Sequence, residues 1–241
     1  MLYNINWQNL YKYGWWLKID RAEIQRKNIL KHSFKLFKEN GYINTTTREI
    51  ANASGINKGL LHYYYKQKED IILEMYEDIL TSLKIYVDSL YKEKANGFVY
   101  YGLLNVLFFR TMSSKTFLMD LLSDMMLYRN LTQIKINKSA EACYSIIENY
   151  KIPITEYQLF LAITVAVGAE AELLFSIKEG KIKMTYDKLA TTINKLLFTM
   201  LKINENEIKS INNKSKDIAE NINTDTVYDY IKEKNSWLQD W

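Results

Sequence analysis

Proline and glycine are scarce in this chain, whose 241 residues include a single proline and eight glycines. Sheets and loop-rich folds use these residues for tight turns, whereas long helices exclude them from their interiors. At 48% hydrophobic and 25% charged residues, the chain can also bury a sizeable core. The sequence therefore predicts an all-α globular fold of one or two domains.

The small number of cysteine and histidine residues excludes an internal disulfide and a usual zinc site. Cys143 is the only cysteine, so no internal disulfide can form, which is consistent with a reducing cytoplasm. Two histidines and one cysteine cannot supply a usual zinc site, and no Gly-rich phosphate loop, GxSxG or HExxH motif is present. We therefore expect no metal, no cofactor and no enzymatic activity. Glu170 and Glu172 interrupt the most apolar window, 159–177, which favours a buried helix over a membrane span.

Basic charge is concentrated near the N-terminus. Residues 17–68 contain eleven Lys or Arg and four Asp or Glu, whereas residues 69–241 contain twenty basic and twenty-four acidic residues. Segregated positive charge is typical of a surface that binds a polyanion such as nucleic acid. A solvated basic face without a partner would give the same distribution, so charge alone does not decide between them.

The segment TTTREIANASGINKGLLHYYY contains two short helices around one glycine. Thr46, with Glu49 three residues later, forms a capping box for the first helix, and Asn57 can cap the second. Gly55 allows the sharp turn between them, since a residue without a Cβ easily adopts a left-handed backbone. Two helices of about two turns joined in this way predict a helix-turn-helix.

A longer helix precedes this pair, from Asp20 as its N-cap to Gly41. The alternative to a helix-turn-helix is an ordinary corner between two core helices. Against that alternative, the last short helix contains Lys58, His62 and Tyr63, where a core helix would have apolar residues.

Later helices are expected at 68–92, 97–112, 115–128, 131–150, 155–178 and 185–202, from apolar residues spaced three and four apart. Beyond residue 203 the chain is polar and rich in Asn, Lys and Glu, which predicts a flexible linker and then a short C-terminal helix from about residue 227. The expected organisation has four parts: an N-terminal extension at 1–17, a helix-turn-helix domain at 18–68, a helical ligand-binding and dimerisation domain at 69–203, and the linker with its helix at 204–241. For the N-terminal extension, one hypothesis is that translation starts at Leu17.

The segment GYINTTTREIANASGINKGLLHYYYKQKED, residues 41–70, resembles the DNA-binding segment of the TetR/AcrR family of bacterial transcriptional regulators. Beyond the first helices the resemblance is only architectural. It implies a cytoplasmic homodimer in which each subunit inserts the helix starting near Lys58 into the major groove of a palindromic operator in double-stranded DNA. By position, the resemblance assigns DNA binding to Thr47, Arg48, Asn57, Lys58, Gly59, Leu60, His62, Tyr63 and Lys68. His62 departs from the family's usual Tyr, and Gln67 from its usual Ser or Asn.

The resemblance also implies a small-molecule effector bound among the later helices. A group of Met and aromatic residues is suited to an apolar or cationic aromatic molecule, although such a group is more often plain core. These candidate ligand-binding residues are Phe109, Met112, Phe117, Met125, Met126, Tyr128 and Tyr144. Either Glu170 or Glu172 could face a cationic ligand, and both could equally project to solvent or pair with a lysine.

Two late helices are expected to meet their symmetry copies as a four-helix dimer interface. The helix expected at 155–178 contributes a stripe of small residues, and the helix expected at 185–202 contributes a matching apolar face. The residues are Ala162, Val165, Ala166, Ala169 and Leu173, with Leu189, Ile193, Leu196, Leu197 and Met200.

The sequence thus predicts a ligand-responsive, homodimeric DNA-binding repressor. One alternative is a DNA-binding protein of the same fold without a small-molecule ligand, acting as a structural or division-linked factor. Another is a helical protein that sequesters a ligand and has no operator affinity.

Overall fold

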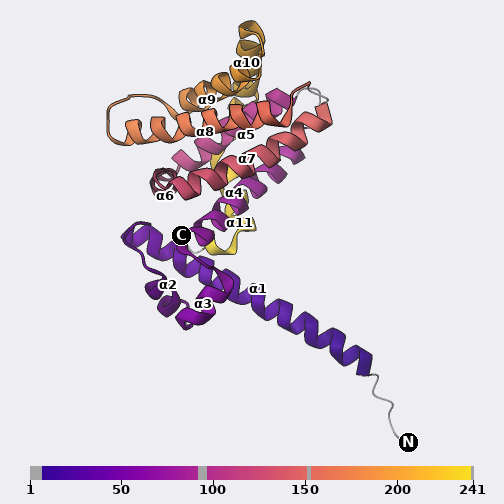
Figure 1. Ribbon diagram of the computed structural model, residues 1–241, viewed down its shortest axis with the longest axis vertical. Coiled ribbons are helices and arrows are strands. Elements are labelled where there is room, and N and C mark those ends of the chain that lie inside the picture. The colour runs from indigo at the N-terminus through magenta and orange to yellow at the C-terminus, as the bar shows by residue number, and fades with distance from the viewer. Residues whose placement is uncertain (1–6, 92–96, 151–152, 240–241) are drawn as a thin grey trace, which may run out of the picture. The chain divides into compact units, whose positions relative to one another are not determined.

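The computed structural model describes residues 7–91, 97–150 and 153–239, and every regular element among them is a helix, as expected from the sequence (Figure 1). The chain divides into two compact units. Unit 1 comprises Met1–Ile71 and Ser236–Trp241, and unit 2 comprises Ile72–Asn235. The elements are α1 (Trp7–Asn40), α2 (Thr47–Ala53), α3 (Lys58–Tyr64), α4 (Lys68–Leu90), α5 (Gly97–Ser113), α6 (Thr116–Leu127), α7 (Arg129–Tyr150), α8 (Glu156–Lys178), α9 (Tyr186–Met200), α10 (Glu205–Glu220), α11 (Thr224–Lys234) and the 3-10 turn η1 (Ser236–Leu238).

In unit 1, α2 packs on both α1 and α3. The turns that separate these helices are those expected from the sequence: Gly41 and Gly55 have φ angles of 80° and 66°, in the left-handed region that favours glycine. The core of this unit is built from Ile29, Leu30, Phe34, Phe37, Tyr42, Ile50, Ala51, Leu61, Tyr65, Trp237 and Leu238.

The start of α1 differs from the prediction. The helix begins at Trp7, so Asp20 lies inside it and is not an N-cap, and most of the N-terminal extension is helical. Residues 7–20 contain no proline, and their single glycine costs a helix only about 1 kcal/mol. Nothing in this backbone therefore ends the helix at Asp20. Residues 1–6 of the predicted extension lie outside the described part of the chain.

Unit 2 is a bundle around α5, which contacts α6, α7, α9, α10 and α11. The α8 helix packs against α6, α7 and α9 (Figure 1). The expected bounds of α4 to α9 agree with the structure to within a few residues. By length and composition alone α8 could cross a membrane, but such a helix is also common in protein cores, and here it packs within the bundle.

The predicted linker after residue 203 is wrong, because residues 205–220 form α10. One face of this helix is buried through Ile208, Ile211, Ser215 and Ala219, and it packs on α5. The Ser215 hydroxyl donates to the Val99 carbonyl oxygen at 3.0 Å. The two helices approach closely because Gly102 of α5 has no side chain: a Cβ there would lie 2.5 Å from Ser215 Oγ.

The expected C-terminal helix is present as α11, which buries Val227, Tyr228 and Ile231 and contacts α5. At its end the Asn235 side-chain amide donates to Ser82 Oγ at 3.0 Å and to the Ile231 carbonyl oxygen at 2.8 Å. The next residue begins η1, which belongs to unit 1 and packs on α1.

Candidate nucleic-acid interface and ligand cavity

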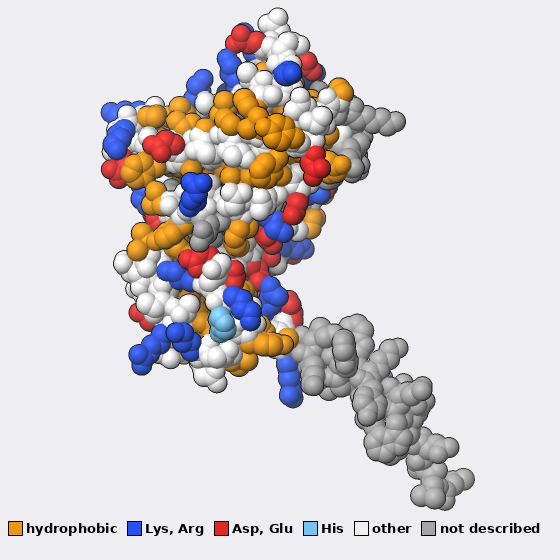
Figure 2. Space-filling model, in the orientation of Figure 1, with side chains coloured by type: hydrophobic (Ala, Val, Ile, Leu, Met, Phe, Trp, Pro, Cys, Tyr) orange, Lys and Arg blue, Asp and Glu red, His pale blue; other side chains and the backbone are white. Residues whose placement is uncertain are grey.

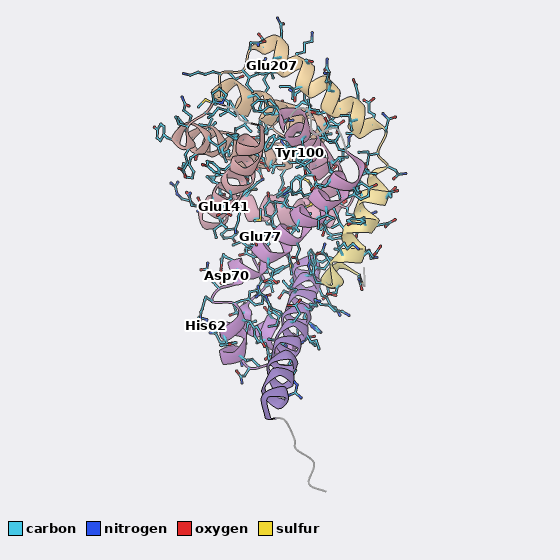
Figure 3. All side chains as sticks on the ribbon, turned by 90° about the vertical axis from the view of Figure 1, so that its right-hand side faces the viewer. His62, Asp70, Glu77, Tyr100, Glu141 and Glu207 are labelled. Carbon is cyan, nitrogen blue, oxygen red and sulfur yellow. The ribbon has the colours of Figure 1, made fainter. Side chains whose placement is uncertain are left out.

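The α3 helix presents a polar edge to solvent. Its N-terminus is capped by Asn57, whose Oδ1 accepts a hydrogen bond from the Leu60 backbone N–H at 2.8 Å. Leu61 is buried and anchors the opposite side. The exposed residues are those that the sequence assigned to DNA: Lys58, Gly59, Leu60, His62 and Tyr63, of which Tyr63 is 75% exposed. Figure 3 shows His62 at the outer edge of this unit.

The N-terminus of α2 is fixed by the predicted capping box. Thr46 Oγ1 accepts from the Glu49 N–H at 3.2 Å, and Glu49 Oε2 accepts from the Thr46 N–H at 2.7 Å. These hydrogen bonds from the Thr46 backbone and side chain lower the pKa of Glu49. In the first turn Arg48 is exposed and Thr47 is partly exposed, and Figure 2 shows Lys and Arg side chains gathered over these helices.

Lys68, which the resemblance assigns to DNA binding, makes hydrogen bonds within its own unit. Its ammonium donates to the carbonyl oxygens of Tyr42 at 2.6 Å, Thr45 at 2.8 Å and Ile43 at 3.4 Å, and it lies 4.2 Å from the Tyr42 ring centroid. An ammonium has three N–H donors, so these carbonyls engage all of them. Burial lowers the pKa of Lys68, against the opposing effect of Glu69 and Glu49. This lysine holds the loop between α1 and α2.

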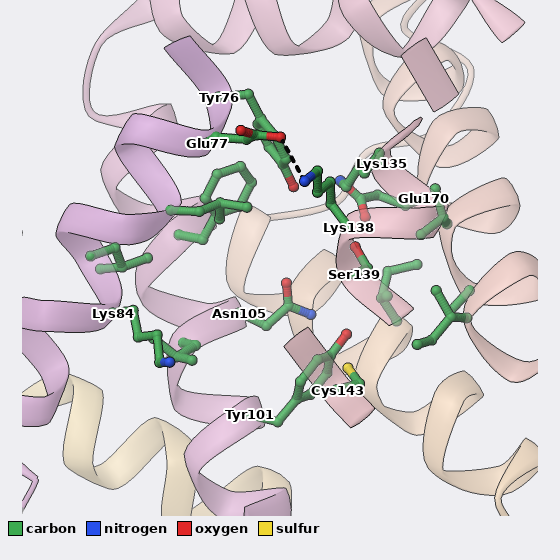
Figure 4. A pocket seen from close by; sticks show the side chains of 18 of the residues that line it. Tyr76, Glu77, Lys84, Tyr101, Asn105, Lys135, Lys138, Ser139, Cys143 and Glu170 are labelled. Carbon is green, nitrogen blue, oxygen red and sulfur yellow. Dashed lines mark hydrogen bonds and ion pairs between the residues drawn. The ribbon is translucent and has the colours of Figure 1, made fainter. Parts of the chain in front are cut away.

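Unit 2 contains a cavity of about 360 Å³ lined by α4, α5, α7, α8 and α9. That volume falls in the range typical of small-molecule sites. Most of its wall is apolar or aromatic, with polar groups from α4 and α7 (Figure 4). The lining residues are Tyr76, Glu77, Leu80, Thr81, Leu83, Lys84, Tyr101, Leu104, Asn105, Phe108, Lys135, Lys138, Ser139, Cys143, Ile163, Ala166, Val167, Glu170 and Ile193.

A buried ion pair between Lys135 and Glu170 forms part of this wall. Burial by itself lowers the pKa of Lys135, but Glu170 and the Tyr76 hydroxyl outweigh burial and raise it. Of the three alternatives left open for Glu170, the structure selects pairing with a lysine. Close to this pair, Lys138 of α7 pairs with Glu77 of α4 at 3.4 Å (Figure 4).

The cavity also contains the only cysteine of the chain. Burial raises the pKa of the Cys143 thiol to about 12, a shift that a hydrogen bond with Tyr101 partly offsets. Burial likewise raises the pKa of Tyr101. Both groups are therefore neutral near pH 7 and act as weakly polar parts of an apolar wall.

None of the seven residues predicted to bind ligand lines this cavity. Four of them, Phe109, Met112, Met125 and Met126, are buried and pack elsewhere in the bundle; Phe117 and Tyr128 are partly exposed and Tyr144 is exposed. Periodicity identifies which residues are buried, but it does not show where packing leaves a space. Of the two glutamates that the sequence singled out in the apolar helix α8, Glu170 lines the cavity and Glu172 does not.

The predicted dimer residues fall into two groups. Ala162, Ala166, Leu189, Ile193 and Leu197 are buried within the chain's own core, so they are not available to a second subunit. Val165 is exposed, and Ala169, Leu173, Leu196 and Met200 are partly exposed. Tyr157, Phe160 and Leu161, which the sequence analysis did not single out, are also exposed apolar residues on α8.

No group of three or more His, Cys, Asp or Glu side chains in the described part of the chain is placed to hold a metal ion.

Two capped helices around Gly55, the second with an exposed polar edge, define a helix-turn-helix protein. Residues 29–75 match the family model described as bacterial regulatory proteins, tetR family. The similarity to this family covers the N-terminal helix-turn-helix region of the chain.

Individual relatives match over short stretches of the chain. The HTH-type transcriptional regulator AcrR of Shigella flexneri is 34% identical over 56 residues, which is 23% of this chain and 26% of that protein. The HTH-type transcriptional regulator QacR of Staphylococcus aureus is 44% identical over 50 residues, 21% of this chain and 27% of that protein. The matches thus span about a quarter of the length of these relatives.

Among solved structures, the fatty acid degradation regulator FadR from Bacillus halodurans aligns with 72% of this chain and 94% of its own, at 17% identity and a TM-score of 0.46. Similarity at this level assigns neither a ligand nor a function.

Proposed function

We propose that this protein is a DNA-binding transcriptional regulator that acts as a homodimeric repressor in the bacterial cytoplasm. The observation that supports this most directly is the exposed edge of α3, where Lys58, His62 and Tyr63 face solvent beside a buried Leu61 anchor. A short helix presented in this way can enter a major groove and offer hydrogen-bonding side chains to base edges. The TetR-family domain at residues 29–75 supports the same function.

Each part of the unit has a distinct proposed task. Arg48 and Thr47 at the start of α2 contact the phosphate backbone and position the helix. Lys58, His62 and Tyr63 supply the contacts that distinguish one sequence from another. If each subunit neutralises about four phosphates, operator affinity falls by about four decades between 50 and 200 mM salt.

The cavity in unit 2 supports a small-molecule effector with a largely apolar body, which can be aromatic or cationic. Its wall includes Tyr76, Tyr101 and Phe108, which suit such a molecule. A ligand that prefers one conformation of the dimer by roughly 1 to 3 kcal/mol changes operator affinity about 5- to 150-fold. Helix α4 lines this cavity and begins in unit 1 at Lys68, so it is the proposed lever.

The test begins with selection of binding sites from a random DNA pool by the full-length protein. We expect enrichment of one palindrome, and we expect His62→Ala and Tyr63→Ala each to weaken binding to it by roughly 5- to 150-fold. Lys188→Ala, an exposed change on α9 in unit 2, is the control and should bind as wild type. Unchanged affinity in both α3 variants would contradict the proposed placement of this helix.

Compounds are then screened for release of the best site. Release of DNA by an apolar or cationic aromatic compound would support a small-molecule effector. If the protein instead occupies many dispersed genomic sites and no compound releases it, the ligand-independent alternative is supported. Ligand binding without any operator affinity would match a sequestering protein.

A further inference from the structure

The C-terminal end of the described chain packs into the core of unit 1. Trp237 and Leu238 of η1 are 2% and 0% exposed, and η1 packs on α1. The Trp237 ring stands edge-on to Phe34, with centroids 5.0 Å apart and planes inclined by 62°. Trp237 has the largest side chain among the fully buried residues of the described chain.

This arrangement makes the core of the DNA-binding unit depend on a distant segment. Residues 1–71 alone lack both Trp237 and Leu238, because all of unit 2 lies between them in sequence. Removing an aromatic ring of this size from a core leaves a cavity that the surroundings fill only in part. The α1–α3 arrangement is therefore incomplete unless η1 is seated on α1.

The segment is also fixed on its other side. Asn235, the last residue of unit 2, is held to Ser82 of α4 and to the Ile231 carbonyl by its side-chain amide. Unit 1 begins again at the next residue, so only Ser236 separates the hydrogen-bonded Asn235 from the buried Trp237. Unit 1 is thus connected covalently to unit 2 twice, through α4 and through the peptide bond after Asn235.

We propose that Ser236–Leu238 form a C-terminal latch: unit 1 is ordered and competent for DNA only while Trp237 and Leu238 are seated on α1. Because the latch continues directly from α11, a rearrangement of unit 2 reaches unit 1 through this segment as well as through α4. The proposal rests on the DNA-binding function proposed above.

The test compares Trp237→Ala, Leu238→Ala and the control Trp237→Phe in the full-length chain, each measured by operator affinity and by amide hydrogen exchange. We expect Trp237→Ala to speed exchange in α1 and α3 by roughly 100- to 1000-fold and to weaken operator binding at least tenfold. Amides of α5 and α8 should keep wild-type exchange, since unit 2 does not contain the ring. Trp237→Phe keeps an aromatic edge against Phe34 and should stay within a few-fold of wild type.

Leu238→Ala keeps the proposal testable if Trp237→Ala unfolds unit 1, because it removes a smaller side chain. We expect it to speed hydrogen exchange in unit 1 and to weaken operator binding, each by less than Trp237→Ala does. Wild-type operator affinity in both alanine variants would overturn the latch, even if exchange in α1 were faster. A wild-type protein that binds no duplex at all would instead overturn the DNA-binding function, which separates the two failures.

Discussion

At position 68, a lysine ammonium satisfies three backbone carbonyls that the loop between α1 and α2 leaves without helical partners. It donates to Tyr42, Ile43 and Thr45, and the Tyr42 ring lies against the charge. Hydrogen bonds to charged groups contribute more than neutral ones, and an abandoned buried carbonyl loses its solvation as well. One side chain therefore sets the geometry of the entry into α2.

Replacing this lysine separates a structural role from a phosphate contact. We expect Lys68→Ala to lower the stability of unit 1 by about 2 kcal/mol in denaturant unfolding. The slope of log operator affinity against log salt should stay as in wild type, because no phosphate contact is removed. A slope smaller by about 1.8, or 0.9 for each of the two subunits, with unchanged stability would restore the phosphate role. Lys66→Ala, an exposed neighbour, controls for stability.

The sequence identified the exposed and capping residues of unit 1 but not the role of Lys68. Capping boxes and left-handed glycines are local, so Thr46, Glu49 and Gly55 reveal their conformations from their own neighbours. Lys68 is bonded to residues more than twenty positions away, and no spacing rule connects a lysine to the carbonyls of a distant loop.

Among the helices, α10 shows why polar composition is a poor guide to flexibility. Its apolar residues Ile208, Ile211, Ile218 and Ala219 recur at helical spacing, so the period was present in the sequence although the overall composition is polar. Its position depends on Gly102 of α5, whose missing side chain leaves room for Ser215. Complementarity between two distant helices is a tertiary property, and neither sequence shows it alone.

An ion pair at the junction of α5, α9 and α10 gives unit 2 a pH-dependent contribution to stability. Arg110 donates from Nε to Asp187 Oδ1 at 2.8 Å and from Nη2 to Oδ2 at 2.7 Å, while Nη1 donates to the Ala219 carbonyl at 2.8 Å. The hydrogen bonds from Arg110 hold the pKa of Asp187 below its ordinary value. The folded state therefore keeps this carboxylate charged at a pH where the unfolded chain protonates it.

We expect Asp187→Asn to destabilise the protein by about 1 to 2 kcal/mol at pH 7, a bidentate pair being stronger than an exposed one. Because the folded pKa is the lower one, wild type keeps this stabilisation above about pH 4 and loses it as the pH falls through the lowered pKa. Urea unfolding at pH 7 and pH 3 should show the difference between wild type and variant shrinking in acid. If the stability difference between wild type and Asp187→Asn were the same at pH 7 and pH 3, the proposed link between the Asp187 pKa and stability would be wrong. As a control, Glu205→Gln, at the exposed pair with Lys195, should leave stability unchanged.

For the whole molecule, DNA recognition by two subunits requires a surface that joins them, and α8 offers one. Tyr157, Leu161 and Val165 lie one helical turn apart and are all exposed, so they form an apolar stripe along one face of α8. A two-fold axis through such a stripe brings each residue against the same surface of its partner. Burial of this stripe in a dimer would also account for apolar side chains that a monomer would leave in water.

Leu161→Glu tests this surface, since a two-fold axis would bury two new carboxylates near each other without partners. We expect sedimentation to show wild type at twice the chain mass of 28.5 kDa and the variant at a single chain mass. Operator affinity should fall about 100-fold or more, because the second half-site, about 34 to 36 Å away, is no longer bound by a linked helix. Ile85→Glu, an exposed apolar residue on α4, should remain dimeric. If the Leu161→Glu protein is still dimeric and has full operator affinity, the subunits meet through another surface. That other surface would then set the distance between the two α3 helices.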